Sequence, residues 1–355
     1  MGPSASCQYF DPRISVLDNL LQEMYKPKIL ISVLNWNKAN ETLVCLDSLI
    51  DEVKSAHAEV TILVLDNASN PEDLSKLYAG TGHLPVVIQA LPENTGFTGG
   101  HNVAIMKAMN EQFEFIWLVN NDAAAAPGTL NLLIQEMAGN PRCGAASPVI
   151  VNDRAGTIME ACIGTYDWAS RKLTRASSLT EGKRIQAEST SNSWLSGTAI
   201  FFRVAALGEV GMLEARMFAY YDDVDICARL TSAGWTSRCV FSASVFHEPK
   251  GKIDQLPLYC FYLTQRNDML FWSKNTPSKL RRYLWLKILD TALFDVNLIY
   301  QGGHKAAGDA ALLGVVDYYA RNFRAPDLNR KVPAMFRALC KASGFLYRKK
   351  LSSQA

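Results

Sequence analysis

The sequence predicts an α/β protein with a mostly parallel β-sheet flanked by helices, followed by a mainly helical C-terminal region. Short β-branched apolar runs alternate with helical patterns four times between residues 28 and 137. A spacing of about 30 residues is typical of parallel strands joined by helical crossovers. Residues from about 150 to 190 are polar and irregular, and the chain after residue 256 is helical and rich in aromatic and basic residues.

Each expected element follows from its local pattern. Apolar runs predict strands at 28–34, 60–65, 86–89, 113–119, 194–204 and 238–246. Helical spacing of apolar residues predicts helices at 40–53, from about 72, at 99–109, 127–137 and 223–234. Asn40 is a candidate cap for the first helix, and Pro127 suits the first turn of the fourth.

Composition is that of a globular protein, with 48% hydrophobic and 20% charged residues. The eight cysteines include no C-x-x-C pair, which favours reduced thiols in a cytosolic protein over a disulfide framework or a zinc site. The first 22 residues contain no signal-peptide pattern. No apolar run approaches the roughly 20 residues needed to span a bilayer. We therefore expect a soluble or peripheral protein.

Charge is distributed unevenly along the chain. The segment from Lys279 to the end contains 14 Lys or Arg against five Asp and no Glu. Such a basic region indicates an anionic partner, either a membrane surface or a phosphate-bearing acceptor, unless it is only a solvated Lys-rich surface. We divide the chain into a lead-in at 1–28, an α/β domain at 29–255 and a helical basic region at 256–355.

Polar residues follow the predicted strands, where ligands bind in an open parallel sheet. The first strand ends near Asn35, and the second ends in Asp66, which is placed to contact a base or ribose unless it only forms an Asx-turn. No G-x-G-x-x-G follows the first strand and no P-loop motif is present, so a dinucleotide site and a P-loop lose their main support.

Two further segments at strand ends carry candidate ligands. The loop 92–102 has three glycines ahead of a helix, which suits close approach of a phosphate, although a flexible connection would look similar. Asn120, Asn121 and Asp122 offer hard oxygen ligands for Mg²⁺ or Mn²⁺, with a helix cap as the alternative.

The segment 220–225 (YYDDVD) is the densest acidic cluster beside apolar sequence. Crowded carboxylates can raise one pKa toward neutrality and create a general base, although acidic residues also stabilise a helix N-terminus. His247 ends an apolar strand and is a candidate contact for a metal or diphosphate, although a lone histidine is often structural.

Taken together, these segments resemble glycosyltransferase family 2, whose members invert the anomeric centre and have the GT-A fold, and within it a rhamnosyltransferase-like branch. The ordered motifs are 33–37 (VLNWN), 65–70 (LDNASN), 93–102 (ENTGFTGGHN), 117–122 (WLVNND), 195–199 (LSGTA), 221–229 (YDDVDICAR) and His247. Each motif is weak alone, and their order along about 29–250 makes the resemblance specific.

The resemblance implies a role for each matching residue. Asp223 would be the catalytic base, and Asp122 with His247 would bind Mg²⁺ or Mn²⁺. The implied donor-binding residues are Asn35, Asp66, Asn94, Gly96, Asn102, Asn120, Asn121 and Gly197. Trp194, Asp222 and Asp225 would lie on the acceptor side.

The implied reaction moves a sugar, with rhamnose as one candidate, from a dTDP-, UDP- or GDP-linked donor to a hydroxyl of a glycan or lipid-linked acceptor. Such an enzyme would serve cell-wall or polysaccharide synthesis at the inner face of the plasma membrane, as a monomer or homo-oligomer and without nucleic acid. A sugar nucleotidyltransferase or a non-catalytic nucleotide-sugar-binding protein are the alternatives.

The chain departs from the family pattern at three places. Asn120 stands first in the metal motif, Asp222 replaces a glutamate, and Glu248-Pro-Lys-Gly251 follows the histidine. The first leaves a single carboxylate in the metal motif. The last changes the residues that the resemblance would place against the donor on that side.

Overall fold

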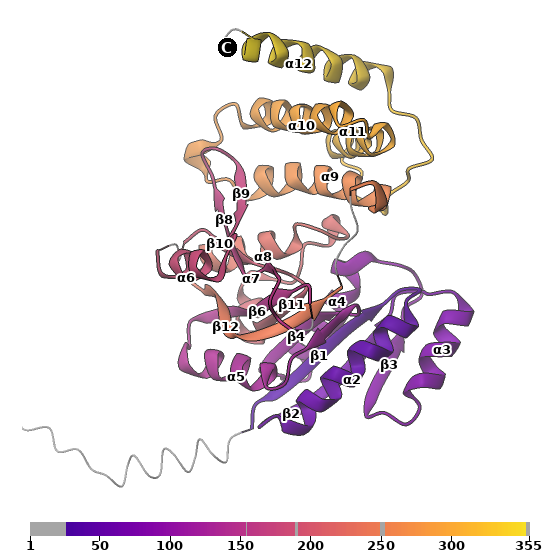
Figure 1. The fold of residues 1–355 in the computed structure, drawn as a ribbon, viewed down its shortest axis with the longest axis vertical. Coiled ribbons are helices and arrows are strands. Elements are labelled where there is room, and N and C mark those ends of the chain that lie inside the picture. The colour runs from indigo at the N-terminus through magenta and orange to yellow at the C-terminus, as the bar shows by residue number, and fades with distance from the viewer. Residues whose placement is uncertain (1–25, 154, 189–190, 249–252, 353–355) are drawn as a thin grey trace, which may run out of the picture.

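Figure 1 shows the computed structural model of the chain, which describes residues 26–153, 155–188, 191–248 and 253–352. Most of the predicted lead-in at 1–28 and most of the segment 248–251 therefore lie outside the described residues. The strands are β1 (Lys28–Asn35), β2 (Glu59–Asp66), β3 (Val86–Ala90), β4 (Phe115–Asn120), β5 (Ala123–Ala125), β6 (Cys143–Val151), β7 (Met159–Ala161), β8 (Ile163–Asp167), β9 (Lys172–Arg175), β10 (Ser193–Leu195), β11 (Ala199–Arg203) and β12 (Thr236–His247).

Helices connect and cover these strands (Figure 1). The helices up to residue 232 are α2 (Ala39–Ser55), α3 (Pro71–Thr81), α4 (Gly96–Asn110), α5 (Thr129–Gly139), α6 (Leu179–Glu188), α7 (Val204–Val210), the short η1 (Ala215–Met217) and α8 (Asp222–Ser232). Those that follow are η2 (Ile253–Gln255), α9 (Leu258–Asn275), η3 (Ser278–Leu280), α10 (Leu284–Gln301), α11 (Lys305–Tyr319) and α12 (Ala334–Ser352).

The main sheet has the strand order β3-β2-β1-β4-β11-β6-β12-β5, with β7 paired to β6. Strands β3, β2, β1 and β4 are parallel to one another, as the four predicted strand–helix units require. Strand β11 enters antiparallel between β4 and β6, so the second half of the sheet is mixed. The predicted mostly parallel α/β sheet, with a helical C-terminal region, is confirmed.

Strand β1 lies inside the sheet and is apolar on both faces, which explains its unbroken hydrophobic run. Ile29, Ile31 and Val33 pack on one face with α2 and α5, whereas Leu30 packs on the other with α4 and α8. This alternation follows from the two-residue period of a strand. The helices therefore cover both faces and leave the carboxyl ends of the strands for a site (Figure 1).

Two local predictions are corrected. Residues 194–204 do not form one strand, because the chain crosses from the small sheet β10-β8-β9 to the main sheet between Leu195 and Ala199. Asn40 does not cap α2, which begins at Ala39. The Ala39 amide instead donates to Asp73 Oδ1 at 2.9 Å, so a residue of α3 satisfies this helix end.

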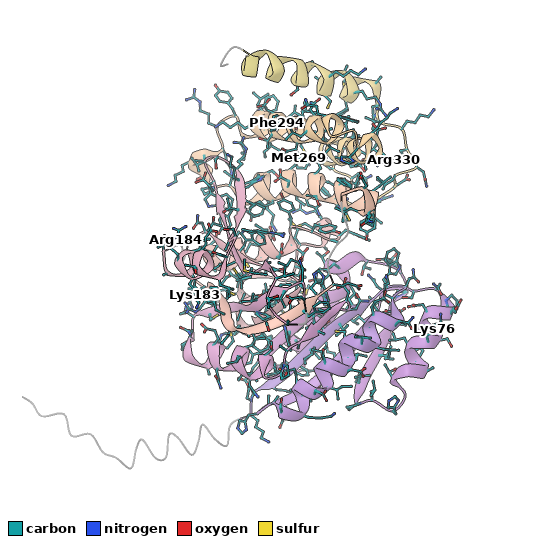
Figure 2. All side chains as sticks on the ribbon, in the orientation of Figure 1. Lys76, Lys183, Arg184, Met269, Phe294 and Arg330 are labelled. Carbon is teal, nitrogen blue, oxygen red and sulfur yellow. The ribbon has the colours of Figure 1, made fainter. Side chains whose placement is uncertain are left out.

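The C-terminal region is a stack of helices, of which α9 lies nearest the sheet (Figure 1). Met269 of α9 and Phe294 of α10 lie within this stack, and Arg330 lies beside α11, where it pairs with Asp317 (Figure 2). Gly314 allows α11 to approach the backbone of α9 closely, because a methyl group there would overlap Tyr262 O. The basic region is thus packed onto the rest of the protein.

Among the described residues no helix is long and apolar enough to cross a membrane. The seven cysteines in this part of the chain are not joined by disulfide bonds.

Candidate active site

The carboxyl ends of β1, β2 and β4 lie side by side and gather the predicted polar residues. Asn35 pairs in register with Asp66, and Leu34 pairs with Asn120. Motifs separated by up to 86 residues therefore meet at one edge of the sheet. This arrangement follows from the parallel pairing of three strands that the sequence predicts.

Asn35 and Asp66 are buried side by side at this edge of the sheet. Asn35 Nδ2 donates to Asp66 Oδ1 at 2.8 Å and to Asp73 Oδ2 at 3.0 Å, and its Oδ1 accepts from Thr42 Oγ1 at 2.7 Å. Asp66 Oδ2 accepts from the Ser69 amide at 3.0 Å, a local turn contact that reaches one residue further than an Asx-turn. Asn35 is fully buried, so the structure places it as the residue that orients Asp66.

Asn67 organises the loop that follows β3. Its Nδ2 donates to Asn94 Oδ1 at 3.0 Å and to Gly96 O at 3.1 Å, and its Oδ1 accepts from the Thr95 amide at 3.0 Å. Asn94 Oδ1 also accepts from the Gly96 amide at 2.8 Å. The glycine-rich loop is therefore fixed by amide side chains and opens helix α4.

Asn102 lies six residues beyond Gly96 in α4 and faces a different element. Its amide donates to Leu213 O and accepts from Leu213 N, both at 2.9 Å. These two bonds use the side chain to hold the segment before η1. The structure therefore places Asn102 as a clamp on that segment and away from the strand ends.

Gly96 has φ +74°, and a methyl group there would overlap the carbonyl oxygen and ring of Phe218. Gly96→Ala is therefore expected to combine backbone strain with a clash and to lower stability by about 1–3 kcal/mol. Denaturant unfolding measures this loss. Gly208→Ala is the control, because a methyl group at Gly208 meets nothing within 4 Å. Equal stability of the two variants would contradict the prediction.

The turn 120–122 follows β4 and leads into β5, so the alternative of a helix cap is wrong. Asn121 Nδ2 donates to Thr42 Oγ1 at 3.1 Å, which ties the turn to α2. Asp122 lines a cavity of about 350 Å³ between α2 and β5, which Glu248 also lines. Asp122 is therefore accessible beside the strand ends.

His247 lies between Asp122 and Glu160, a residue that the sequence motifs did not indicate. Its Nε2 lies 3.2 Å from Asp122 Oδ1, and its Nδ1 lies 2.8 Å from Glu160 Oε2. Burial alone would lower the pKa of His247, but its interactions with the Asp122 and Glu160 carboxylates outweigh burial and raise the pKa to about 9. Glu160 reaches the site because β7 pairs with β6, and its polar, irregular sequence context gave no signal for this.

Asp222 and Asp223 open helix α8. Asp223 Oδ2 accepts from the Gly197 amide at 3.0 Å, and its Oδ1 accepts from the Val224 amide at 2.8 Å. Burial raises the pKa of Asp223 against the opposing effect of these amides. Burial and then the neighbouring Asp223 charge raise the pKa of Asp222 well above its usual range. Gly197 therefore holds the predicted base.

Two residues predicted on the acceptor side are placed elsewhere. Asp225 is fully buried, accepts from Arg229 Nε at 2.8 Å and pairs with Lys274 Nζ at 2.9 Å. Trp194 is buried in the small sheet, where its Nε1 donates to Thr165 O at 3.3 Å. Both are corrected to packing residues, because neither side chain has an open face for an acceptor.

The turn before α8 is strained. Phe218, Tyr220 and Tyr221 have φ of 64°, 69° and 69°, in the left-handed region. This region costs roughly 1–2 kcal/mol for each residue with a side chain. Such strain persists only where surrounding contacts hold it, and here it immediately precedes Asp222 and Asp223.

The mixed α/β sheet carries Asp122 and His247 at its strand ends, and Asp222 and Asp223 stand at the start of α8. The family model for glycosyl transferase family 2 matches residues 30–211, and the chain belongs to that family. This confirms the family prediction.

Curated relatives agree with this assignment. An N-acetylglucosaminyl-diphospho-decaprenol L-rhamnosyltransferase of Mycobacterium tuberculosis is 28% identical over 217 residues, which are 53% of this chain and 66% of the relative. A galactofuranosyltransferase of Mycolicibacterium smegmatis is 24% identical over 52% of this chain and 60% of its own length. The matches thus cover less than two thirds of these relatives.

Solved structures show the same fold. A mannosyltransferase of Pyrobaculum calidifontis, in complex with GDP-Man and Mn²⁺, has a TM-score of 0.53 at 16% identity and covers 92% of this chain and 86% of its own. TarS of S. aureus, in complex with UDP-GlcNAc, has a TM-score of 0.52 at 14% identity, over 88% of this chain and 83% of its own. These likenesses confirm the predicted GT-A-type fold.

Proposed function

We propose that this protein is an inverting glycosyltransferase that moves a sugar from a nucleoside-diphosphate donor to a hydroxyl group of an acceptor. The proposal rests on two acidic sites that neighbouring residues connect. Asp122 with His247 forms one, and Asp222 with Asp223 forms the other. The Asn120 amide, at the first site, donates to Thr198 O at 2.9 Å, and Gly197, which holds Asp223 at the second, directly precedes Thr198. A single displacement needs one group for the departing diphosphate and another for the attacking hydroxyl.

Asp223 is the proposed base. Its carboxylate removes the proton from the acceptor hydroxyl while that oxygen forms a bond to the anomeric carbon. The bond from this carbon to the diphosphate oxygen breaks on the opposite face, and the nucleoside diphosphate leaves. The raised pKa of Asp223 favours its action as a base, and the Gly197 amide fixes its orientation.

Asp122 and His247 suit a divalent cation such as Mg²⁺ or Mn²⁺. Among the described residues no group of three His, Cys, Asp or Glu side chains could enclose an ion. Two protein ligands still fit, because such ions commonly take their remaining ligands from water and substrate phosphates. When bound, the ion neutralises the negative charge of the leaving diphosphate. His247 would coordinate through Nε2, with Glu160 accepting a hydrogen bond from Nδ1.

The relatives guide the choice of substrates. The mycobacterial relative carries an L-rhamnosyltransferase name with a decaprenol-linked acceptor. We therefore propose rhamnose as the first donor sugar to test and a polyprenol-linked glycan as the acceptor, in cell-wall or polysaccharide synthesis. UDP-GlcNAc and GDP-Man, bound by neighbours in the fold, are the next donors.

Transfer assays test the function directly. The protein is incubated with dTDP-rhamnose, UDP-GlcNAc or GDP-Man, a polyprenol-linked acceptor and Mn²⁺, and the product is detected by mass spectrometry. A product with inverted anomeric configuration supports the proposal. Retained configuration would refute the single displacement, and nucleotide-sugar synthesis from a triphosphate would favour a nucleotidyltransferase.

The exposed residues of the C-terminal region suggest a contact with the membrane that would carry a lipid-linked acceptor. Tyr283 and Trp285 at the start of α10 are 57% and 62% exposed, and basic residues Lys279 and Arg282 neighbour them in sequence. Aromatic rings beside cations suit the headgroup region of an anionic membrane. Leu284 and Ile288, in the same helix, are buried and do not belong to this surface. We propose peripheral docking at the inner face of the plasma membrane.

Liposome co-sedimentation tests the docking. We expect binding to phosphatidylglycerol vesicles at low salt, weakened by added salt, and weak binding to phosphatidylcholine, because each nearby cation contributes about 1 kcal/mol. Trp285→Ser with Arg282→Glu should reduce binding, whereas Met106→Ser, at an exposed position on α4, should not. Absence of binding to anionic vesicles would refute this contact.

A further inference from the structure

Two fully buried polar residues of α9, Arg266 and Asn267, contact the strained turn. They come from the C-terminal region, outside the segment that the family model matches. Burying polar groups is costly unless each finds partners, so their contacts indicate what they stabilise.

Asn267 binds the turn through three carbonyl groups. Its Nδ2 lies 2.7 Å from Met217 O, 2.8 Å from Ala219 O and 3.0 Å from Tyr220 O. An amide nitrogen has only two hydrogens, so one must be shared between two acceptors. Three carbonyl groups that would otherwise repel one another thus converge on a single side chain.

Arg266 extends the same contact. Its Nη2 donates to Arg216 O at 3.1 Å and Met217 O at 3.2 Å, and its Nε donates to Asn267 Oδ1 at 3.2 Å. The Nη1 group donates to Arg324 O at 2.8 Å. These hydrogen bonds end on neutral oxygens rather than on a carboxylate. The guanidinium fork therefore fixes backbone carbonyls and orients the Asn267 amide.

Residues 216–221 connect two parts of the site, the acidic pair Asp222 and Asp223 and the glycine-rich loop at the start of α4. Tyr220 and Tyr221, in the left-handed region, lead directly into Asp222 and Asp223. The carbonyl of Phe218 accepts from the Thr98 amide at 3.0 Å, at the start of α4. Residues 216–220 can therefore set the position of the base and of the glycine-rich loop together.

We propose that Arg266 and Asn267 are positioning residues for the reaction, which hold the strained turn 216–221 and thereby fix Asp223 relative to the donor. The proposal rests on the function assigned to Asp223 above. It makes helix α9 part of the catalytic apparatus, although no side chain of that pair touches the reacting atoms.

Asn267→Ala tests the proposal. We expect kcat to fall about 10²-fold, because misplacement of a reacting group by about 1 Å costs that much, with a smaller rise in the KM for the donor, because the turn also contacts the start of α4 through Phe218 O. Asn297→Ala is the matched control. Asn297 Nδ2 also binds two carbonyls, Leu293 O and Cys340 O, both at 2.8 Å, but within the helical stack.

Hydrogen–deuterium exchange supplies a readout that does not depend on catalysis. Peptides covering 216–224 should exchange faster in Asn267→Ala than in the wild type, and should be unchanged in Asn297→Ala. If exchange in this segment is the same in both variants, the clamp is refuted, whatever the assay shows. If exchange rises but Asp223→Asn retains wild-type kcat, the assignment of the base has failed and the clamp stands as a structural contact only.

Arg266→Lys keeps the positive charge but loses the planar guanidinium group that binds several carbonyl oxygens. It should disturb the turn less than Asn267→Ala does, and it replaces that variant if Asn267→Ala does not fold. A roughly tenfold fall in kcat with a smaller change in the donor KM is expected for a partial loss of positioning. Loss of stability with unchanged kcat per folded molecule, in either variant, would overturn the proposal.

Discussion

Asp223→Asn is expected to lower kcat about 10²- to 10⁴-fold, the contribution of a general base, while donor binding stays close to wild type. Asparagine keeps the shape and can still accept from the Gly197 amide, which lies 3.0 Å from Oδ2, but it cannot take up a proton. Steady-state kinetics and donor titration by calorimetry measure the two effects. Near-wild-type kcat would eliminate Asp223 as the base.

The pH profile gives an independent check of the same residue. The base acts when deprotonated, so wild-type kcat should be high above the pKa of Asp223 and fall as the pH drops through it. Because burial raises that pKa, the fall should occur at higher pH than for an exposed aspartate. Asp222→Asn is the companion variant. Because the Asp223 charge raises the pKa of Asp222 well above its usual range, Asp222 is protonated while Asp223 titrates, so this variant should leave the midpoint nearly unchanged.

Asp122→Ala is expected to weaken metal-dependent binding of the nucleoside diphosphate by about 10²-fold or more, because the ion contributes several kcal/mol. No second carboxylate stands in the turn 120–122 to replace it. Calorimetry with and without Mn²⁺ separates the metal-dependent affinity from the rest. Unchanged affinity and unchanged metal dependence would refute the role of Asp122.

Glu160→Gln is a milder variant for the same calorimetry of metal-dependent binding. Glutamine can still accept from His247 Nδ1, which lies 2.8 Å from Glu160 Oε2, but without the negative charge. Metal affinity should therefore fall less than in Asp122→Ala, by about 10- to 100-fold.

The sequence predicted those parts of the site that depend on local pattern. Asp66, Asn120 and Asp122 follow buried apolar strands, and parallel strands bring their ends together. The prediction failed where tertiary contacts decide. Asp225 shares the acidic segment with Asp223 but points to Lys274, because successive residues of a helix face different directions.

Residues from later elements had no pattern to reveal them. Glu160 belongs to a three-residue strand whose pairing with β6 brings it beside His247. Asn267 lies in an apolar and aromatic helix that predicts packing, and only its contacts with the turn show what it does. In both cases the sequence separation from the partner exceeds the range over which helix and strand periodicity is informative.

The carbonyl of Phe218 has a thermodynamic consequence. Phe218 belongs to the turn that leads to Asp223, and its carbonyl accepts from the Thr98 amide at the glycine-rich loop. Ordering one of these segments therefore lowers the entropic cost of ordering the other. We therefore expect donor and acceptor to bind with positive cooperativity, each raising the affinity for the other by the same factor.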